Sequence, residues 1–196
     1  TYSKISREHL INEGLQANRI INIGSPMFEV INFFKKKIDK SNILKKLQLK
    51  KNNYIVLSSH REENVENLKN FKNLLEILQI LNDFFKVKVV VSVHPRIQDR
   101  IKKINKDKLN KIIFCKPFSF TDYLKLQIDA KVVLSDSGTI NEEASILNFK
   151  AINLRNSHER PESDEEGTTI MSSLEPDKVK QALLYFNNIK DEKKNI

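Results

Sequence analysis

The stretch KVVLSDSGTINEEASIL, residues 131–147, decides the fold. A β-branched run (131–136) passes through a small-residue turn (137–139) into an amphipathic segment (140–147). Parallel strands need crossover connections, and these are usually helices. The stretch therefore predicts a buried strand, a short turn and a helix.

The same alternation runs along the chain. Further strands are predicted at 19–24, 53–59, 86–93, 111–115 and 150–155. Helices are predicted at 6–16, 26–38, 65–85, 96–104, 120–128 and 176–189. The strands are nearly continuous in Val and Ile rather than alternating, which indicates burial on both faces. The fold class is therefore α/β, a mostly parallel sheet with helices on both faces.

The 196 residues suit one domain, or one domain with an appendage, and carry a net charge of +9. The lysines are scattered over helix-like segments without interleaved aromatic residues. This favours a solvated lysine-rich surface over a nucleic-acid interface, and it also suits a phosphate-bearing small molecule. The single Cys115, with no signal peptide and no long apolar span, predicts a cytoplasmic protein without disulfides or membrane contact.

Polar side chains follow the predicted strands, at the edge of the sheet where α/β proteins bind ligands. His60 and Arg61 follow one strand, His94 follows the next, and Arg160 lies just beyond the last. Each has an ordinary alternative, such as a capping role or a surface ion pair. Their common edge nevertheless makes a pocket for a nucleotide diphosphate the better account.

Ser137, Gly138 and Thr139 open a predicted helix, where backbone N–H groups and the helix dipole favour an anion. Plain helix capping is the alternative. The chain has four glycines and neither a P-loop nor a dinucleotide fingerprint.

Glu142 and Glu143 point about 100° apart on that helix, so only one of them can face the edge. A carboxylate there can accept hydrogen bonds from two ribose hydroxyls. The alternative is a surface glutamate that the helix dipole favours.

Four motifs in this order resemble the non-hydrolysing UDP-N-acetylglucosamine 2-epimerases: HREEN (60–64), VHPR (93–96), DSGTINEEAS (136–145) and SHERPE (157–162). Residues 11–26 also resemble the segment that joins the two domains of that family. Glu62, Thr139 and His158 depart from the family's most typical forms. With segments 118–127 and 145–149, these departures are similar to the subgroup that forms UDP-N-acetyl-L-fucosamine.

The resemblance implies a Rossmann-like domain, one half of a GT-B-like two-domain enzyme. Residues 1–18 are expected to connect from a missing N-terminal domain, 19–190 to form a UDP-binding C-terminal domain, and 191–196 to be a frayed tail. Partners implied are a UDP-sugar, the missing domain and a second copy in a homodimer, with no metal and no cofactor.

Residue roles follow from the resemblance as well. They place His60 at the diphosphate, Ser137, Gly138 and Thr139 at the phosphate-binding helix start, and Glu143 at the ribose. Tyr123 is expected near the uracil and Arg160 at the nucleotide, while Arg61 and His94 match positions that hold a second, allosteric UDP-sugar in some members.

The family reaction eliminates UDP across C1–C2 and adds it back with C2 inverted. The acid/base carboxylates are expected mainly in the missing domain, so this chain is expected to be inactive alone. A UDP-sugar-dependent GT-B glycosyltransferase and a basic nucleic-acid-binding α/β module are the alternatives.

Overall fold

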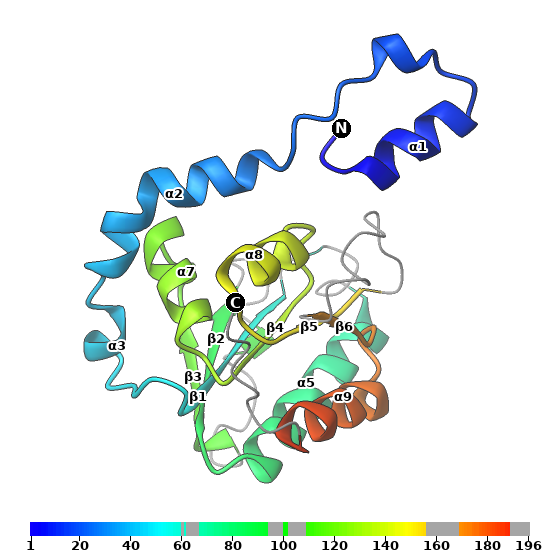
Figure 1. Ribbon diagram of the computed structural model, residues 1–196. Coiled ribbons are helices and arrows are strands. Elements are labelled where there is room, and N and C mark those ends of the chain that lie inside the picture. The colour runs from blue at the N-terminus through cyan, green and yellow to red at the C-terminus, as the bar shows by residue number, and fades with distance from the viewer. Residues whose placement is uncertain (60, 62–66, 94–99, 102–108, 156–168, 189–196) are drawn as a thin grey trace.

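One sheet of six parallel strands organises the part of the chain that the computed structural model describes, residues 1–59, 61, 67–93, 100–101, 109–155 and 169–188 (Figure 1). The strands are β1 (Tyr54–Ser59), β2 (Lys88–Val93), β3 (Ile112–Cys115), β4 (Val132–Ser135), β5 (Ala151–Asn153) and β6 (Thr169–Met171). Their order is β3-β2-β1-β4-β5-β6. This is the strand order of Rossmann folds, and it reverses between β1 and β4.

Helices precede, connect and follow the strands. They are α1 (Lys4–Asn12), the 3₁₀ helix η1 (Ala17–Arg19), α2 (Pro26–Asp39), α3 (Ile43–Lys46), α5 (Leu68–Phe84), α7 (Phe120–Ile128), α8 (Ile140–Leu147) and α9 (Pro176–Asn188). The predictions for 120–128 and 140–147 are confirmed to the residue. The helix predicted at 96–104 lies mostly outside the described residues.

Two apolar layers cover the two faces of the sheet. Along β1, Ile55 and Leu57 face α5 and α9, whereas Tyr54 and Val56 face α7 and α8. This alternation is the period of a strand, and both faces are buried. The sheet is thus covered by helices on both sides, as the sequence predicts.

Helix α2 forms an outer layer over α7. Ile31 and Ile38 of α2 are buried against Leu124 of α7. Ser25 is the N-cap of this helix, and its hydroxyl accepts a hydrogen bond of 3.2 Å from the Met27 N–H. Pro26 occupies the first helical position. The chain thus enters the domain along the outside of α7.

The strand predicted at 19–24 is wrong. Residues 17–19 form η1, and Ile21 and Ile23 are each 72% exposed in an extended connection. This connection bonds back to the chain start, where the Ile23 N–H donates to the Thr1 carbonyl at 3.0 Å. A β-branched run reports local preference, but a strand also needs a neighbouring strand, and no described residues pair with this segment as a strand.

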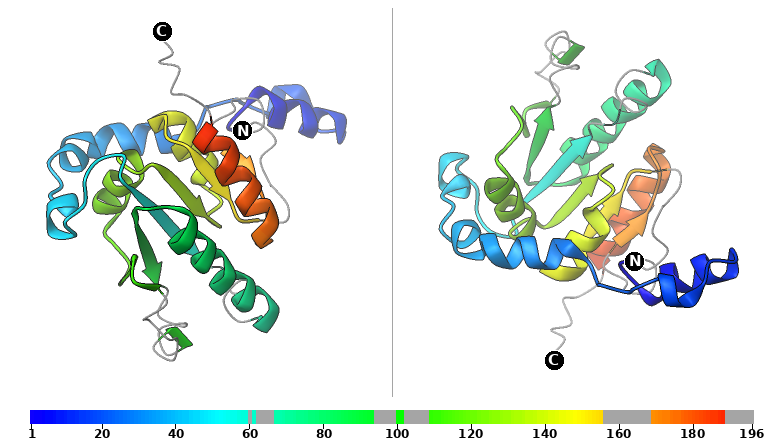
Figure 2. Two further views of the ribbon diagram at one scale, coloured as in Figure 1. Left: turned by 90° about the horizontal axis from the view of Figure 1, so that it is seen from below. Right: turned by 90° about the horizontal axis from the view of Figure 1, so that it is seen from above.

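Helix α1 projects from the body of the molecule in all three ribbon views (Figures 1 and 2). It buries no residue, and two of its hydrogen bonds go to residues 17 and 20 nearby in sequence. The Arg7 guanidinium donates to the Ile20 and Ala17 carbonyls, each at 3.1 Å. Residues 1–23 therefore form a small local unit beside the sheet.

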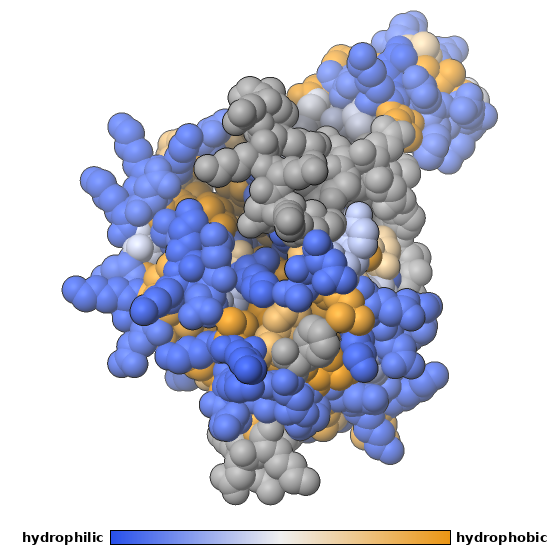
Figure 3. All heavy atoms as spheres, turned by 60° about the horizontal axis from the view of Figure 1, so that its bottom comes forward, coloured by the Kyte–Doolittle hydropathy of each residue, from blue (hydrophilic) through white to orange (hydrophobic). Residues whose placement is uncertain are grey.

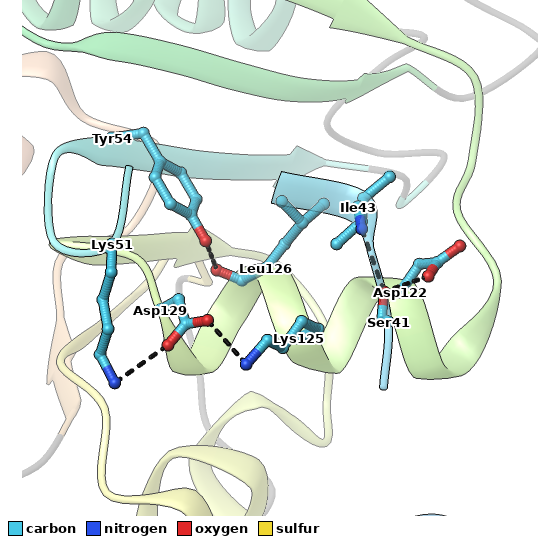
Figure 4. Close-up of polar contacts among 8 residues, drawn as sticks. All are labelled: Ser41, Ile43, Lys51, Tyr54, Asp122, Lys125, Leu126 and Asp129. Atoms are coloured by element: carbon cyan, nitrogen blue, oxygen red, sulfur yellow. Dashed lines mark hydrogen bonds and ion pairs between the residues drawn. The ribbon is translucent and has the colours of Figure 1, made fainter. Parts of the chain in front are cut away.

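Helix α7 is tied down at both ends (Figure 4). At its start, the Ser41 hydroxyl donates to the Asp122 carboxylate at 2.5 Å. Near its end, the Tyr54 hydroxyl donates to the Leu126 carbonyl at 2.7 Å. Burial, followed by the charge of Asp129, raises the pKa of the Tyr54 phenol, which holds the donor in its protonated form.

The last residue of that network, Asp129, is bridged by two lysines. Lys125 lies 2.9 Å and Lys51 3.1 Å from its carboxylate (Figure 4). These contacts fix the end of α7 against the sheet.

Figure 3 shows one face, on which hydrophilic side chains surround smaller hydrophobic areas. None of the described helices combines the length and apolar character that a membrane crossing requires.

Candidate functional site

The strand order reverses between β1 and β4, and Rossmann-type sheets bind ligands beyond the carboxyl ends of the strands at such a reversal. Asp136, directly after β4, is fully buried there. One of its carboxylate oxygens accepts from the Ser59 hydroxyl at 2.8 Å and from the Arg61 N–H at 3.1 Å. Asp136 therefore fastens the residues on both sides of position 60 to the end of β4.

A chain of hydroxyls then leads from the end of β4 into α8. The Ser137 N–H donates to the Ser135 hydroxyl at 3.1 Å, and the Ser137 and Thr139 hydroxyls lie 2.9 Å apart. Thr139 is the N-cap residue of α8, but its side chain makes no capping hydrogen bond to a backbone N–H of the helix. Simple capping by this hydroxyl is therefore not its role.

The Thr139 hydroxyl instead donates to Glu143, at 2.7 Å from one carboxylate oxygen. The other oxygen of Glu143 accepts from the Gln127 amide at 2.8 Å. Glu143 is 6% exposed, so its carboxylate is held in one orientation from two sides. Each oxygen keeps a lone pair that a further donor can use.

Glu142 points elsewhere. It accepts a hydrogen bond from the Ser25 hydroxyl at the start of α2. The two glutamates therefore serve different neighbours, as their angular separation on the helix requires.

Tyr123 stands at the same edge, on α7, with its hydroxyl turned inward. Burial raises the pKa of this phenol, while the adjacent Ser58 and Ser135 hydroxyls act in the opposite direction. Neither serine makes a hydrogen bond of normal geometry to it, and the hydroxyl is buried without a partner in the described part of the chain. The residue as a whole is half-buried and packs against the apolar layer beneath α7 and α8.

Gly138 and Arg155 meet beside the turn. A side chain at position 138 would begin 3.4 Å from the Arg155 guanidinium, which is 6% exposed. The arginine that follows β5 is thus packed against the turn between β4 and α8.

The structure brings together Arg61, Tyr123, Glu143 and the 137–139 turn. His60, His94 and Arg160 lie outside the described residues, as do Glu62 and His158. Within the described ranges, no three His, Cys, Asp or Glu side chains gather in a way that would hold a metal ion.

Two residues of this site, Asp136 and Gln127, are not among those the sequence singled out for binding. Each acts on a partner brought close only by folding. A signal for Gln127 exists, since it lies three positions after Leu124 and directly before Ile128, where helical spacing predicts an apolar residue.

An arrangement of this kind defines an α/β protein of Rossmann type, as found in GT-B-like epimerases. The profile of the UDP-N-acetylglucosamine 2-epimerase family matches residues 1–196. A UDP-N-acetylglucosamine 2-epimerase of Methanocaldococcus jannaschii is 30% identical over 200 residues, which cover 98% of this chain and 55% of that protein. The chain therefore belongs to the UDP-N-acetylglucosamine 2-epimerase family.

Solved structures agree with this assignment. The UDP-N-acetylglucosamine 2-epimerase from Rickettsia bellii matches with a TM-score of 0.86 and 42% identity, over 97% of this chain and 51% of that one. The M. jannaschii enzyme in complex with UDP-GlcNAc and UDP matches with a TM-score of 0.85 and 31% identity, over 97% and 54%. This chain spans about half the length of the relatives it matches.

Proposed function

We propose that this chain is the UDP-binding C-terminal half of a UDP-N-acetylhexosamine 2-epimerase. The observation that carries the proposal is the pairing of the α8 start with the buried Glu143 carboxylate, 2.7 Å from the Thr139 hydroxyl, at the reversal of strand order. A helix start favours a diphosphate, and a fixed carboxylate beside it favours a vicinal diol. Likeness to an enzyme in complex with UDP-GlcNAc and UDP supports the same reading.

The nucleotide would lie over the carboxyl ends of β1 and β4. The diphosphate lies at Ser137, Gly138 and Thr139, and the ribose hydroxyls donate to Glu143. The uracil lies near Tyr123, which is half-buried at this edge of the sheet. His60 and Arg160 complete the grip on the phosphates by their likeness to the family motifs.

The proposed reaction removes the proton from C2 and breaks the C1–oxygen bond, which releases UDP and leaves a 2-acetamidoglucal. A proton then adds to C2 from the opposite face, and a UDP oxygen re-forms the bond to C1. The residues of this chain stabilise the departing diphosphate. The acid and base at C2 would come from outside this chain.

The finer assignments belong to the same proposal. The departures at Glu62, Thr139 and His158 favour the subgroup that makes UDP-N-acetyl-L-fucosamine for capsule or O-antigen, with UDP-N-acetylmannosamine as the other product. Residues 1–18 would connect from the other domain, and the complete enzyme would be a homodimer in the cytoplasm. Arg61 and His94 would face a second UDP-sugar where such regulation exists.

Calorimetric titration of this chain with UDP tests the proposal. The parent is expected to bind, and Glu143→Ala and Arg160→Ala to weaken binding roughly 10- to 100-fold, since each removes hydrogen bonds in which one partner is charged. Glu142→Gln is the matched control, because the neighbouring carboxylate points to Ser25, and it should bind UDP as the parent does. A folded parent that takes up no UDP contradicts the proposal.

A further inference from the structure

Gln127 is a fully buried amide on α7, a helix whose neighbouring positions 124 and 126 carry buried leucines. Burying an amide is unfavourable unless it is hydrogen-bonded. Its side-chain nitrogen donates to Glu143 at 2.8 Å, which also fixes the amide orientation, since a carboxylate oxygen accepts from the NH₂ group.

The other half of the Gln127 amide is unsatisfied. Its oxygen is buried without a hydrogen-bond partner in the described part of the chain, as is the Tyr123 hydroxyl one helical turn earlier. An apolar side chain of the same size would avoid that cost. The position therefore carries glutamine for its N–H donor and not for packing.

The helix that carries Gln127 is held in place by contacts on both sides of this residue. The backbone carbonyl of its neighbour Leu126 accepts a hydrogen bond from the Tyr54 hydroxyl, and the Asp129 carboxylate forms ion pairs with Lys51 and Lys125 (Figure 4). A donor on a helix fixed in this way can hold a carboxylate within a narrow range of positions.

The donor on the opposite side is the Thr139 hydroxyl. The two donors reach different oxygens of Glu143. The carboxylate plane is thus set before any ligand arrives.

We propose that Gln127 is a positioning residue for Glu143 and, through it, sets how strongly the site distinguishes a ribonucleotide from a 2′-deoxyribonucleotide. The identity of the ligand in this inference rests on the proposed function, whereas the hydrogen bond between Gln127 and Glu143 does not depend on it. A carboxylate that must accept from two hydroxyls at once depends on its angle more than one that accepts from a single hydroxyl. Gln127→Met should therefore affect UDP more than 2′-deoxy-UDP.

The test is calorimetric titration of the parent, Gln127→Met and Thr139→Val with UDP and with 2′-deoxy-UDP. In Gln127→Met, the affinity for UDP divided by the affinity for 2′-deoxy-UDP is expected to fall about five- to tenfold. The affinity for 2′-deoxy-UDP should fall less than the affinity for UDP. Thr139→Val should move the ratio in the same direction. Gln79→Leu is the matched control, since it removes a glutamine–carboxylate bond of 2.7 Å to Asp83 on α5, and it should leave the ratio unchanged.

A general loss of stability would weaken the binding of both nucleotides equally and leave the ratio of their affinities unchanged. An unchanged ratio in a folded Gln127→Met variant overturns the inference.

If the parent binds neither nucleotide, the proposed function fails, and the pairing is judged by a double-mutant cycle in urea unfolding. Gln127→Met and Glu143→Gln are then combined, and additive effects overturn the pairing while non-additive effects uphold it.

Discussion

Ser59 and Asp136 lie 77 positions apart in the chain, and their side chains are joined by a 2.8 Å hydrogen bond where the strand order reverses. The same carboxylate oxygen accepts from the Arg61 N–H at 3.1 Å. Asp136 thus couples the end of β1 to the turn that opens α8. The two segments proposed to meet the diphosphate are fixed to one another through a single buried carboxylate.

Asp136→Ala should lower the free energy of unfolding by about 1–3 kcal/mol, because a buried hydroxyl and a backbone N–H lose their acceptor. Ser59→Ala removes one of the two bonds and should cost about 1 kcal/mol. Urea unfolding followed by circular dichroism measures both. Asp39→Ala, at the exposed end of α2, is the control and should stay within about 0.5 kcal/mol of the parent. Equal stability of Asp136→Ala and the parent would refute this role.

The contact between Ser25 and Glu142 predicts a coupling between the start of α2 and α8. Ser25→Ala should cost about 1 kcal/mol, since it also removes the capping bond to the Met27 N–H. In combination with Glu142→Gln, the two effects should depart from additivity by about 0.5 kcal/mol or more. Agreement with the simple sum would mean that the contact does not stabilise the fold.

Much of the fold could be predicted from sequence because the determining signals are local. The strand ending at Ser135 is β-branched and fully buried, and α7 and α8 each follow a hydroxyl-bearing residue. Strand β6 was not predicted, because its three residues carry too short a pattern. The error at 19–24 has the opposite cause, a strong local pattern without a partner strand.

The residues of the candidate site also differ in whether local sequence predicts them. Glu143 and the 137–139 turn could be selected because a strand end and a helix start are adjacent in sequence. The roles of Asp136 and Gln127 could not be predicted, because their partners lie 77 and 16 positions away and only the folded chain brings them together.

Tyr54 predicts a loss of stability at alkaline pH. The pKa of its phenol is raised in the folded protein, first by burial and then by the charge of Asp129. As the pH rises, the unfolded chain therefore loses this proton first, at about pH 10. The contribution of Tyr54 to stability is full below that pH and declines as the pH rises toward the folded-state pKa.

Tyr54→Phe should be less stable than the parent at neutral pH by about 1 kcal/mol, because the bond to the Leu126 carbonyl is lost. Its stability should then fall less steeply above about pH 10, since one of the groups that drive the fall is gone. Urea midpoints over a pH series measure this. Tyr185→Phe, at a 58% exposed position, should reproduce the parent curve. Parallel curves for Tyr54→Phe and the parent would exclude the effect.

Gly138 and Gly24 predict opposite outcomes for the same substitution. At Gly138 the backbone is ordinary, and an added Cβ would lie 3.4 Å from the Arg155 guanidinium, a van der Waals contact. Gly138→Ala should therefore stay within about 0.5 kcal/mol of the parent. Gly138→Val would press its methyl groups on the 6% exposed Arg155 and should cost about 1–3 kcal/mol.

At Gly24 nothing lies within 4 Å of an added Cβ, but φ is +77°. Gly24→Ala should therefore cost about 1–2 kcal/mol through backbone strain alone, despite the open space. Thermal unfolding of the three variants separates the two causes, since Gly138 is limited by its neighbour and Gly24 by its own backbone. A Gly138→Ala variant that is less stable than Gly24→Ala would show that Arg155 cannot yield, and the turn before α8 would then be the more rigid of the two.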